Sequence, residues 1–291
     1  MRERELLLKP AVMALNDLNL YYITAACEAA QNVQSGQDET SLNRKESTAR
    51  EAAQNVQSGL KTAGNGAPEI TLTGNTVIGK GRPIVLVHGN GEDHHLFDTE
   101  IRQLAEAGFT VYAPDSRGHG KSTLVSDEPV TEYHYADMAE DIYQFIKALG
   151  LKKLALYGHS DGGIIALLLE ISHPGTLGIM AASGTNLSPQ GLIPSFIEEY
   201  SEINKKEEDP LITLMLTEPH IDPESLKKIR IPVLVTAGDN DLILRSETEK
   251  IAAALPDSEM VIVEDADHGS YIMDSEIMGK LLLDFLQRRW C

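Results

Sequence analysis

The sequence has few cysteines and no long apolar run, and these absences exclude several classes of protein. Two cysteines in 291 residues, Cys27 and Cys291, cannot build a disulfide framework, and no cysteine–histidine spacing matches a zinc site. The longest apolar run, residues 162–169, is far shorter than the ~20 residues that cross a bilayer. The segment 1–8 is too charged for a secretory signal. We therefore expect a cytoplasmic protein without a metal or other cofactor.

Basic residues are also scarce. The chain has 25 Lys and Arg against 44 Asp and Glu, a formal net charge of −19. Residues 81–291 hold 17 of the basic and 35 of the acidic side chains. A field of this sign repels phosphate backbones and anionic lipids, which argues against nucleic-acid and membrane partners. The expected partner is a small-molecule substrate, and the oligomeric state stays open.

Phe, Trp and Tyr are absent from residues 23–96, where the nine-residue segment EAAQNVQSG occurs twice, at 28–36 and 51–59. Each copy predicts a short helix that ends at its glycine. Two copies are too few for a solenoid. We interpret residues 23–70 as a duplicated insertion or an engineered segment, without chemistry of its own, within an amino-terminal extension, 1–75. A partner-binding module is the alternative.

From about residue 76, apolar runs of β type alternate with helical stretches. Six runs have strand character: 84–87, 110–113, 154–157, 178–181, 233–236 and 260–263. Five stretches have helical character: 96–107, 135–149, 162–172, 247–255 and 276–288. Continuous apolar strands are typical of a parallel sheet that is buried on both faces. The alternation predicts an α/β domain over 76–291 with a doubly wound, mostly parallel sheet. Residues 186–229 interrupt it and predict a short helical cap.

The turn between the predicted strand 154–157 and the predicted helix 162–172 contains a G-x-S-x-G pattern, Gly158 to Gly162. In this context the pattern predicts a sharp turn that exposes Ser160 at a helix N-terminus, where backbone amides favour negative charge. Ser160 is therefore a candidate nucleophile. The alternative is a serine that only caps the helix.

A serine nucleophile needs a base, and the base needs an acid that orients it. The last two predicted strands are followed by Asp239 and Asp241, and by His268. The order Ser160, Asp241, His268 is nucleophile, acid, base, the chain order in which hydrolases with a G-x-S-x-G turn carry these three groups. We favour Asp241 over Asp239 as the acid.

An oxyanion hole needs two backbone amides. The N–H of Asp161 directly follows the nucleophile, and the loop 88–93 after the first predicted strand supplies a second, for which Asn90 is the best candidate. We expect His88 to hold this loop and the run 115–122 to form a tight structural turn.

Together these motifs resemble the α/β-hydrolase superfamily over roughly residues 76–291. The motifs, in chain order, are His88-Gly89, Asp115 to Ser122, Gly158 to Gly163, Gly238 to Asp241 and Asp267-His268. The resemblance implies the α/β-hydrolase fold and a cap domain at the predicted cap segment.

The resemblance also implies a catalytic triad of Ser160, Asp241 and His268. It implies the amides of Asn90 and Asp161 as the oxyanion hole. An acidic residue directly after the nucleophile is similar to the valacyclovir-hydrolase, or biphenyl-hydrolase-like, branch, which cleaves amino-acid esters. A serine nucleophile disfavours the dehalogenases and epoxide hydrolases of the superfamily, which use aspartate.

We therefore predict a serine hydrolase that cleaves esters of small, partly apolar substrates, with Leu192, Phe196 and Leu214 lining the substrate pocket. The same triad supports thioester, amide, lactone or carbon–carbon bond hydrolysis. A ligand-binding member of the fold without catalysis is a further alternative.

The family's sheet begins with a hairpin, and the sequence offers two. One is Met13 to Tyr22 around Asn16-Asp17, continuing at residues 77–83. The other is Ile70 to Ile78 around Gly74-Asn75, a dipeptide suited to a two-residue turn.

Overall fold

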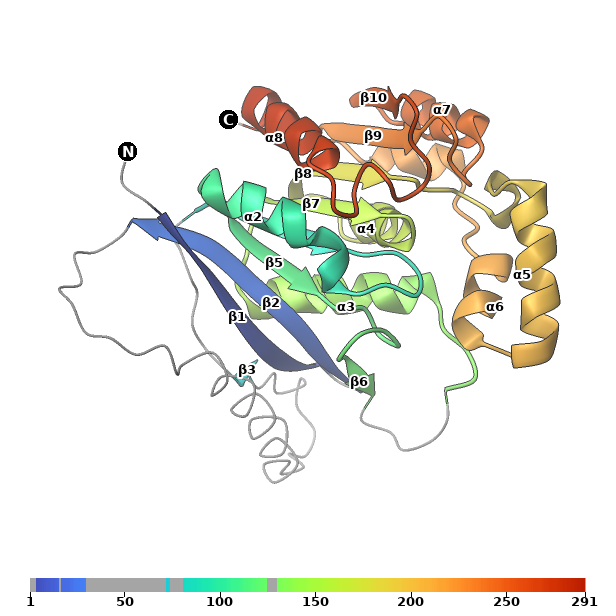
Figure 1. Cartoon of the computed structure of the whole chain (residues 1–291), viewed down its shortest axis with the longest axis horizontal. Helices are drawn as coiled ribbons and strands as arrows, with labels where there is room; N and C mark the ends of the chain where they lie inside the picture. The colour runs from blue at the N-terminus through green and yellow to red at the C-terminus, as the bar shows by residue number, and fades with distance from the viewer. Residues whose placement is uncertain (1–3, 16, 30–71, 74–80, 125–129, 291) are drawn as a thin grey trace.

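The computed structural model describes residues 4–15, 17–29, 72–73, 81–124 and 130–290. The strands are β1 (Arg4–Leu15), β2 (Leu18–Ala29), β3 (Leu72–Thr73), β4 (Pro83–Val87), β5 (Thr110–Pro114), β6 (Thr123–Leu124), β7 (Leu154–His159), β8 (Leu177–Ser183), β9 (Val233–Gly238) and β10 (Ser258–Val263). In these residues they form one sheet in the order β10-β9-β8-β7-β4-β5-β2-β1-β3, and β6 pairs with β2 (Figure 1). Pairing is parallel from β10 to β5 and antiparallel beyond it.

Helices cover both faces of the sheet. They are η1 (His94–Phe97), α2 (Asp98–Glu106), α3 (Tyr135–Ala148), α4 (Asp161–Ser172), η2 (Pro189–Gly191), α5 (Pro194–Glu207), α6 (Pro210–Thr217), η3 (Pro223–Lys228), α7 (Arg245–Ala254) and α8 (Ile277–Arg289). Figure 1 shows α2 and α8 together on one face, with α3 and α4 behind the sheet. The doubly wound, mostly parallel α/β fold predicted from the sequence is confirmed.

The strand β4 shows why the sheet is buried on both faces. Ile84 and Leu86 belong to the apolar cluster under α2 and α8, whereas Val85 and Val87 belong to the cluster under α3, α4 and α7. Successive side chains point to opposite faces of a strand, so a run of four apolar residues fills both cores. All six predicted strands and all five predicted helices are present, with ends shifted by a few residues at most.

The amino-terminal hairpin is part of this sheet. β1 pairs with β2 from Arg4–Ala29 to Leu15–Leu18, and β2 pairs with β5. Met13, Leu18 and Leu20 are fully buried in the cluster under α3. The domain boundary near residue 75 is therefore wrong for this hairpin, because its strands belong to the sheet and these three side chains lie in the core of the domain.

The first of the two hairpins considered from the sequence joins the sheet as part of β1 and β2. β3 pairs with β1, and the other residues of the second hairpin lie outside the described residues. Glu28 and Ala29 end β2, so the helix predicted over 28–36 is wrong at its first two residues, which pair with β1. Residues 23–29 of the predicted insertion 23–70 belong to β2, and the rest of the insertion and of both copies lies outside the described residues.

The predicted cap segment leaves the sheet between β8 and β9. It contains η2, α5, α6 and η3. Figure 1 shows α5 and α6 beside the end of the sheet toward which β8 and β9 point. Because ligands of open α/β sheets bind at the carboxyl ends of the strands, these helices lie over the expected site.

Candidate functional site

Ser160 occupies a strained turn between β7 and α4. Its φ of 52° and ψ of −116° are unusual for a residue with a side chain, and such strain is common at functional turns. A Cβ at position 158 would overlap the carbonyl of Gly162, and one at position 162 would overlap the carbonyl of Val87. The two glycines thus allow the close approach of strand and helix that the G-x-S-x-G spacing predicts.

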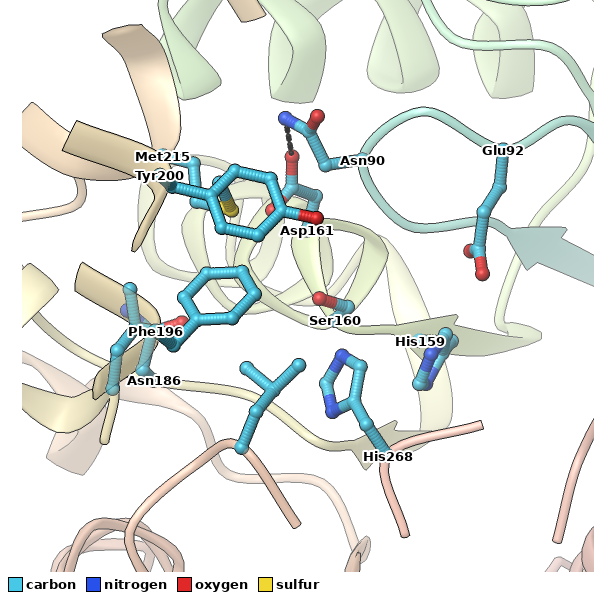
Figure 2. Close-up of a pocket in the computed structure, with 12 residues that line it drawn as sticks. Asn90, Glu92, His159, Ser160, Asp161, Asn186, Phe196, Tyr200, Met215 and His268 are labelled. Carbon is cyan, nitrogen blue, oxygen red and sulfur yellow. Dashed lines mark hydrogen bonds between the residues drawn. The ribbon is translucent and has the colours of Figure 1, made fainter. Parts of the chain in front are cut away.

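His268 and Asp241 are brought together beside Ser160. His268 Nδ1 lies 2.6 Å from Asp241 Oδ1, so the proton sits on Nδ1 and Nε2 is free to accept one. The Asp241 carboxylate is itself held by the N–H groups of Ile243, at 2.9 Å, and Gly238, at 3.2 Å. Figure 2 shows the His268 ring with a nitrogen turned toward the Ser160 hydroxyl. One nitrogen of the His268 ring thus faces the serine, and the other lies against the Asp241 carboxylate.

The neighbouring carboxylate, Asp239, has a different role. Its Oδ1 accepts the N–H of Ala266 at 3.1 Å, which ties the turn after β9 to the turn after β10. Of the two candidate acids, the structure therefore places Asp241 against the histidine.

Two backbone amides lie beside the nucleophile. Asp161 is the first residue of α4, and Asn90 lies in the loop after β4; both line the same cavity as Ser160. Within the described part of the chain, neither N–H has an acceptor at hydrogen-bond distance. Unpaired amides next to a hydroxyl that lines the cavity suit an oxyanion.

His88 holds the loop that carries Asn90. Its Nε2 accepts the N–H of Ser116 at 2.9 Å, and Nδ1 donates to the carbonyl of Gly89 at 2.8 Å. Complete burial and the nearby His119 lower the pKa of His88 to about 4, so its ring is neutral near pH 7. Its geometry fits the structural role expected from the sequence.

The run 115–122 also has a structural role. Asp115 accepts hydrogen bonds from the backbone and ring of His94 and from the N–H of Lys121. Arg117 makes a bidentate pair with Asp141, at 2.6 and 2.7 Å. These contacts fix the tight turn that the sequence predicts.

A cavity of about 190 Å³ opens onto Ser160 between the sheet and the cap. It is lined by Asn90, Glu92, His159, Ser160, Asp161, Asn186, Leu192, Phe196, Tyr200, Met215, Leu242 and His268 (Figure 2). Leu192 and Phe196 were expected there. The Phe196 and Tyr200 rings stack with centres 4.2 Å apart, because residues four apart share one face of a helix. That spacing was the signal by which Tyr200 could have been found.

Leu214 does not line this cavity. It is 2% exposed and packs in the apolar core, while the next residue of α6, Met215, faces the cavity. Each residue of an α-helix is turned by about 100° from the one before it, so neighbours face different ways. An apolar helix such as 210–217 carries no polar face that would reveal its rotation from sequence.

Burial shifts several ionisable groups in the site. Desolvation raises the pKa of Asp161 and of Glu92, although hydrogen bonds oppose both shifts. Desolvation also lowers the pKa of His159 well below its usual value. Sequence reasoning missed Glu92 and His159 as lining residues, since neither lies at a catalytic position of the motifs.

One group of side chains has ligand types suited to a metal. Asp93, His94 and His95 bring three such atoms within 4.8 Å of one another. Asp93 also accepts the N–H of His95 at 2.9 Å, and His94 Nδ1 is bound to Asp115 at 2.6 Å. These contacts hold the start of η1 in place and bind it to Asp115, the residue that follows β5. No helix in the described ranges is long and apolar enough to cross a membrane.

The chain matches a known family over its central part. The family described as "alpha/beta hydrolase fold" matches residues 82–193, which contain Asn90, the 115–122 turn and Ser160.

Individual relatives match over a larger share of the chain. AB hydrolase superfamily protein YisY of Bacillus subtilis (strain 168) is 25% identical and covers 72% of this chain and 92% of that protein. Serine hydrolase BPHL of Homo sapiens is 26% identical over 68% of this chain and 76% of its own length. The structure of the esterase EaEST from Exiguobacterium antarcticum superimposes with a TM-score of 0.59 at 22% identity, covering 72% of this chain and 93% of that one. At this identity the structural likeness shows a shared fold.

Proposed function

We propose that this chain, whose matches indicate the α/β-hydrolase superfamily, is a serine esterase for small, partly apolar substrates. The observation that carries the proposal is the 2.6 Å bond from His268 Nδ1 to Asp241, which leaves Nε2 free on the side of Ser160. The relative named as a serine hydrolase supports the same reaction class.

In the first half of the reaction, Ser160 Oγ attacks the ester carbonyl carbon while His268 Nε2 takes the hydroxyl proton. Asp241 stabilises the resulting imidazolium and keeps its orientation. The carbonyl oxygen becomes an oxyanion, which accepts hydrogen bonds from the backbone N–H groups of Asn90 and Asp161. When the tetrahedral intermediate collapses, the carbon–oxygen bond to the alcohol breaks and His268 gives its proton to the leaving alkoxide.

The second half regenerates the enzyme. A water molecule gives a proton to His268 and attacks the acyl carbon, and the same two amides stabilise the second oxyanion. Collapse breaks the bond to Ser160, which recovers its proton from His268. The products are a carboxylic acid and an alcohol.

The walls of the cavity support a small apolar acyl group. Phe196 and Tyr200 of α5, Met215 of α6, Leu192 and Leu242 form its apolar part. A volume of about 190 Å³ admits a short chain rather than a long fatty acyl chain.

Labelling with a fluorophosphonate probe tests the proposal. We expect the wild type to label and Ser160→Ala and His268→Ala to fail, because the probe reacts with an activated serine. Steady-state hydrolysis of p-nitrophenyl esters from acetate to octanoate then tests the bond type and acyl length. Folded wild-type protein that neither labels nor hydrolyses these esters would contradict the esterase proposal.

A further inference from the structure

The carboxylate of Asp161 is engaged on both oxygens within the protein. Only 5% of the residue is exposed. Oδ1 accepts the hydroxyl of Tyr135 at 2.7 Å, and Oδ2 accepts the side-chain amide of Asn90 at 3.0 Å, the bond that Figure 2 draws as a dashed line. A buried carboxylate with strong donors on both oxygens is oriented by the fold.

The partner Asn90 makes a second bond with its side chain. Its amide nitrogen also donates to the carbonyl of Leu211, at 3.1 Å, in the first turn of α6. Asn90 and Asp161 are the residues whose backbone amides form the proposed oxyanion hole. The side chains of these two residues are thus bonded to each other and to the cap.

The other end of α6 reaches the same network through Glu218. Its Oε2 accepts the backbone N–H of Tyr135 at 3.1 Å, and its Oε1 lies 2.7 Å from His134 Nδ1. Glu218 directly follows α6, and Tyr135 is the first residue of α3. Leu211 and Glu218 therefore connect both ends of the cap helix to the residues that hold Asp161.

We propose that Asp161 is a positioning residue, whose bonds link the position of cap helix α6 to the position of the two oxyanion-hole amides. In this proposal Asp161 does not recognise a positive charge on the substrate. The inference rests on the proposed esterase function. Asn90 lies in an irregular loop, so side-chain bonds rather than a helix or strand ladder set its position. A displacement of about 1 Å in a catalytic donor can cost on the order of a hundredfold in rate.

Two variants and one matched control test the proposal. Tyr135→Phe removes one donor to Asp161. Asp161→Asn leaves one acceptor oxygen where the carboxylate has two, so that either the Tyr135 hydroxyl or the Asn90 amide then faces an amide nitrogen. Tyr143→Phe makes the same chemical change elsewhere on α3 and serves as the control. The substrates are p-nitrophenyl butyrate, which is neutral, and the p-nitrophenyl ester of valine, whose amine is positively charged.

For Tyr135→Phe and Asp161→Asn we expect kcat to fall about ten- to a hundredfold on both esters, with KM within about twofold of wild type. The control is expected to match the wild type. A loss confined to the valine ester and expressed as a higher KM would assign Asp161 to charge recognition and overturn the proposal. Unchanged kcat in both variants would overturn it as well.

Amide hydrogen exchange gives a readout that does not depend on catalysis. In Tyr135→Phe we expect peptides that cover the loop 88–93 to exchange at least about threefold faster than in the wild type, at an unchanged melting temperature of the whole domain. Unchanged exchange in this loop would contradict the coupling. If the wild type failed to label with fluorophosphonate, the esterase proposal would fail, and the exchange measurement would still decide whether the network holds the loop.

Discussion

The imidazole rings of His159 and His268 lie with their centres 4.7 Å apart at the edge of the cavity, yet they have different partners. His268 is bonded to the Asp241 carboxylate, whereas His159 Nδ1 lies 3.1 Å from the hydroxyl of Ser183. Burial, reinforced by the neighbouring histidines, lowers the pKa of His159 well below its usual value. The structure thus separates a neutral, buried imidazole from one placed to act as a base.

His159→Asn tests this separation. Asparagine keeps a polar group near Ser183, and we expect the acid limb of the kcat/KM profile against pH to stay at its wild-type position. His268→Asn should lower kcat by about 10⁴-fold or more, because the serine loses its base. An acid limb that disappears in His159→Asn would show that the wrong histidine has been assigned.

Asp241→Asn and Asp239→Asn form a matched pair at one turn. The first change favours the wrong imidazole tautomer, and kcat should fall by about 10³- to 10⁴-fold with little change in KM. The second keeps an acceptor for the N–H of Ala266, so kcat should stay within about threefold of wild type. Ester hydrolysis and circular dichroism of both variants provide the check, and comparable losses of kcat would refute the assignment of Asp241.

Met215→Ala and Leu214→Ala compare the truncation of a residue that lines the cavity with the truncation of a residue in the apolar core. Met215 faces the cavity, so its truncation should shift the preferred p-nitrophenyl ester toward longer acyl chains. Leu214 is 2% exposed, so its truncation should cost about 2–5 kcal/mol in the free energy of unfolding and leave the acyl preference unchanged. Chain-length profiles and urea unfolding measure the two effects, and a changed profile in Leu214→Ala would contradict the placement.

Glu100 on α2 makes the stability of the domain depend on pH. It is fully buried, both carboxyl oxygens lack a partner among the described residues, and desolvation raises its pKa from about 4.5 to about 8. Between these values the folded state keeps a proton that the unfolded state has lost, so the contribution of this group to stability falls as pH rises. Across the whole window the loss is on the order of 4 kcal/mol.

Glu100→Gln removes the titration and should flatten the fall in the free energy of unfolding between about pH 4.5 and pH 8. Urea unfolding at several pH values measures this slope. Glu106→Gln, at an exposed position of the same helix, is the control and should keep the wild-type slope. A slope that is the same in Glu100→Gln and wild type would mean that Glu100 is not the group responsible.

Much of the fold could be predicted because its signals are local in the chain. A run such as Ile84 to Val87 shows a two-sided strand by itself, and a glycine on each side of Ser160 shows a turn with no room for side chains. The order of the residues that follow successive strands places Asp241 and His268 at one edge of the sheet without knowledge of any contact.

The errors lie where a position depends on distant parts of the chain. The hairpin 4–29 belongs to the sheet because β2 pairs with β5, more than 80 residues away, whereas a sequence without aromatics over 23–96 suggested an extension. Leu214 was placed in the cavity because both it and Met215 are apolar, and the rotation of α6 depends on what packs beneath it.

The sequence by itself determined the order of strands and helices, the strained turn at Ser160 and the identity of the residues at the ends of the strands, since each follows from neighbours along the chain. Only the tertiary structure decided that Asp161 is bonded to Tyr135 and Asn90, and Asn90 to Leu211, across separations of 26, 71 and 121 residues. Such bonds depend on how loops and helices settle against a common core. Composition and spacing carry no information on those contacts, because side chains far apart in sequence meet only when the whole domain has packed.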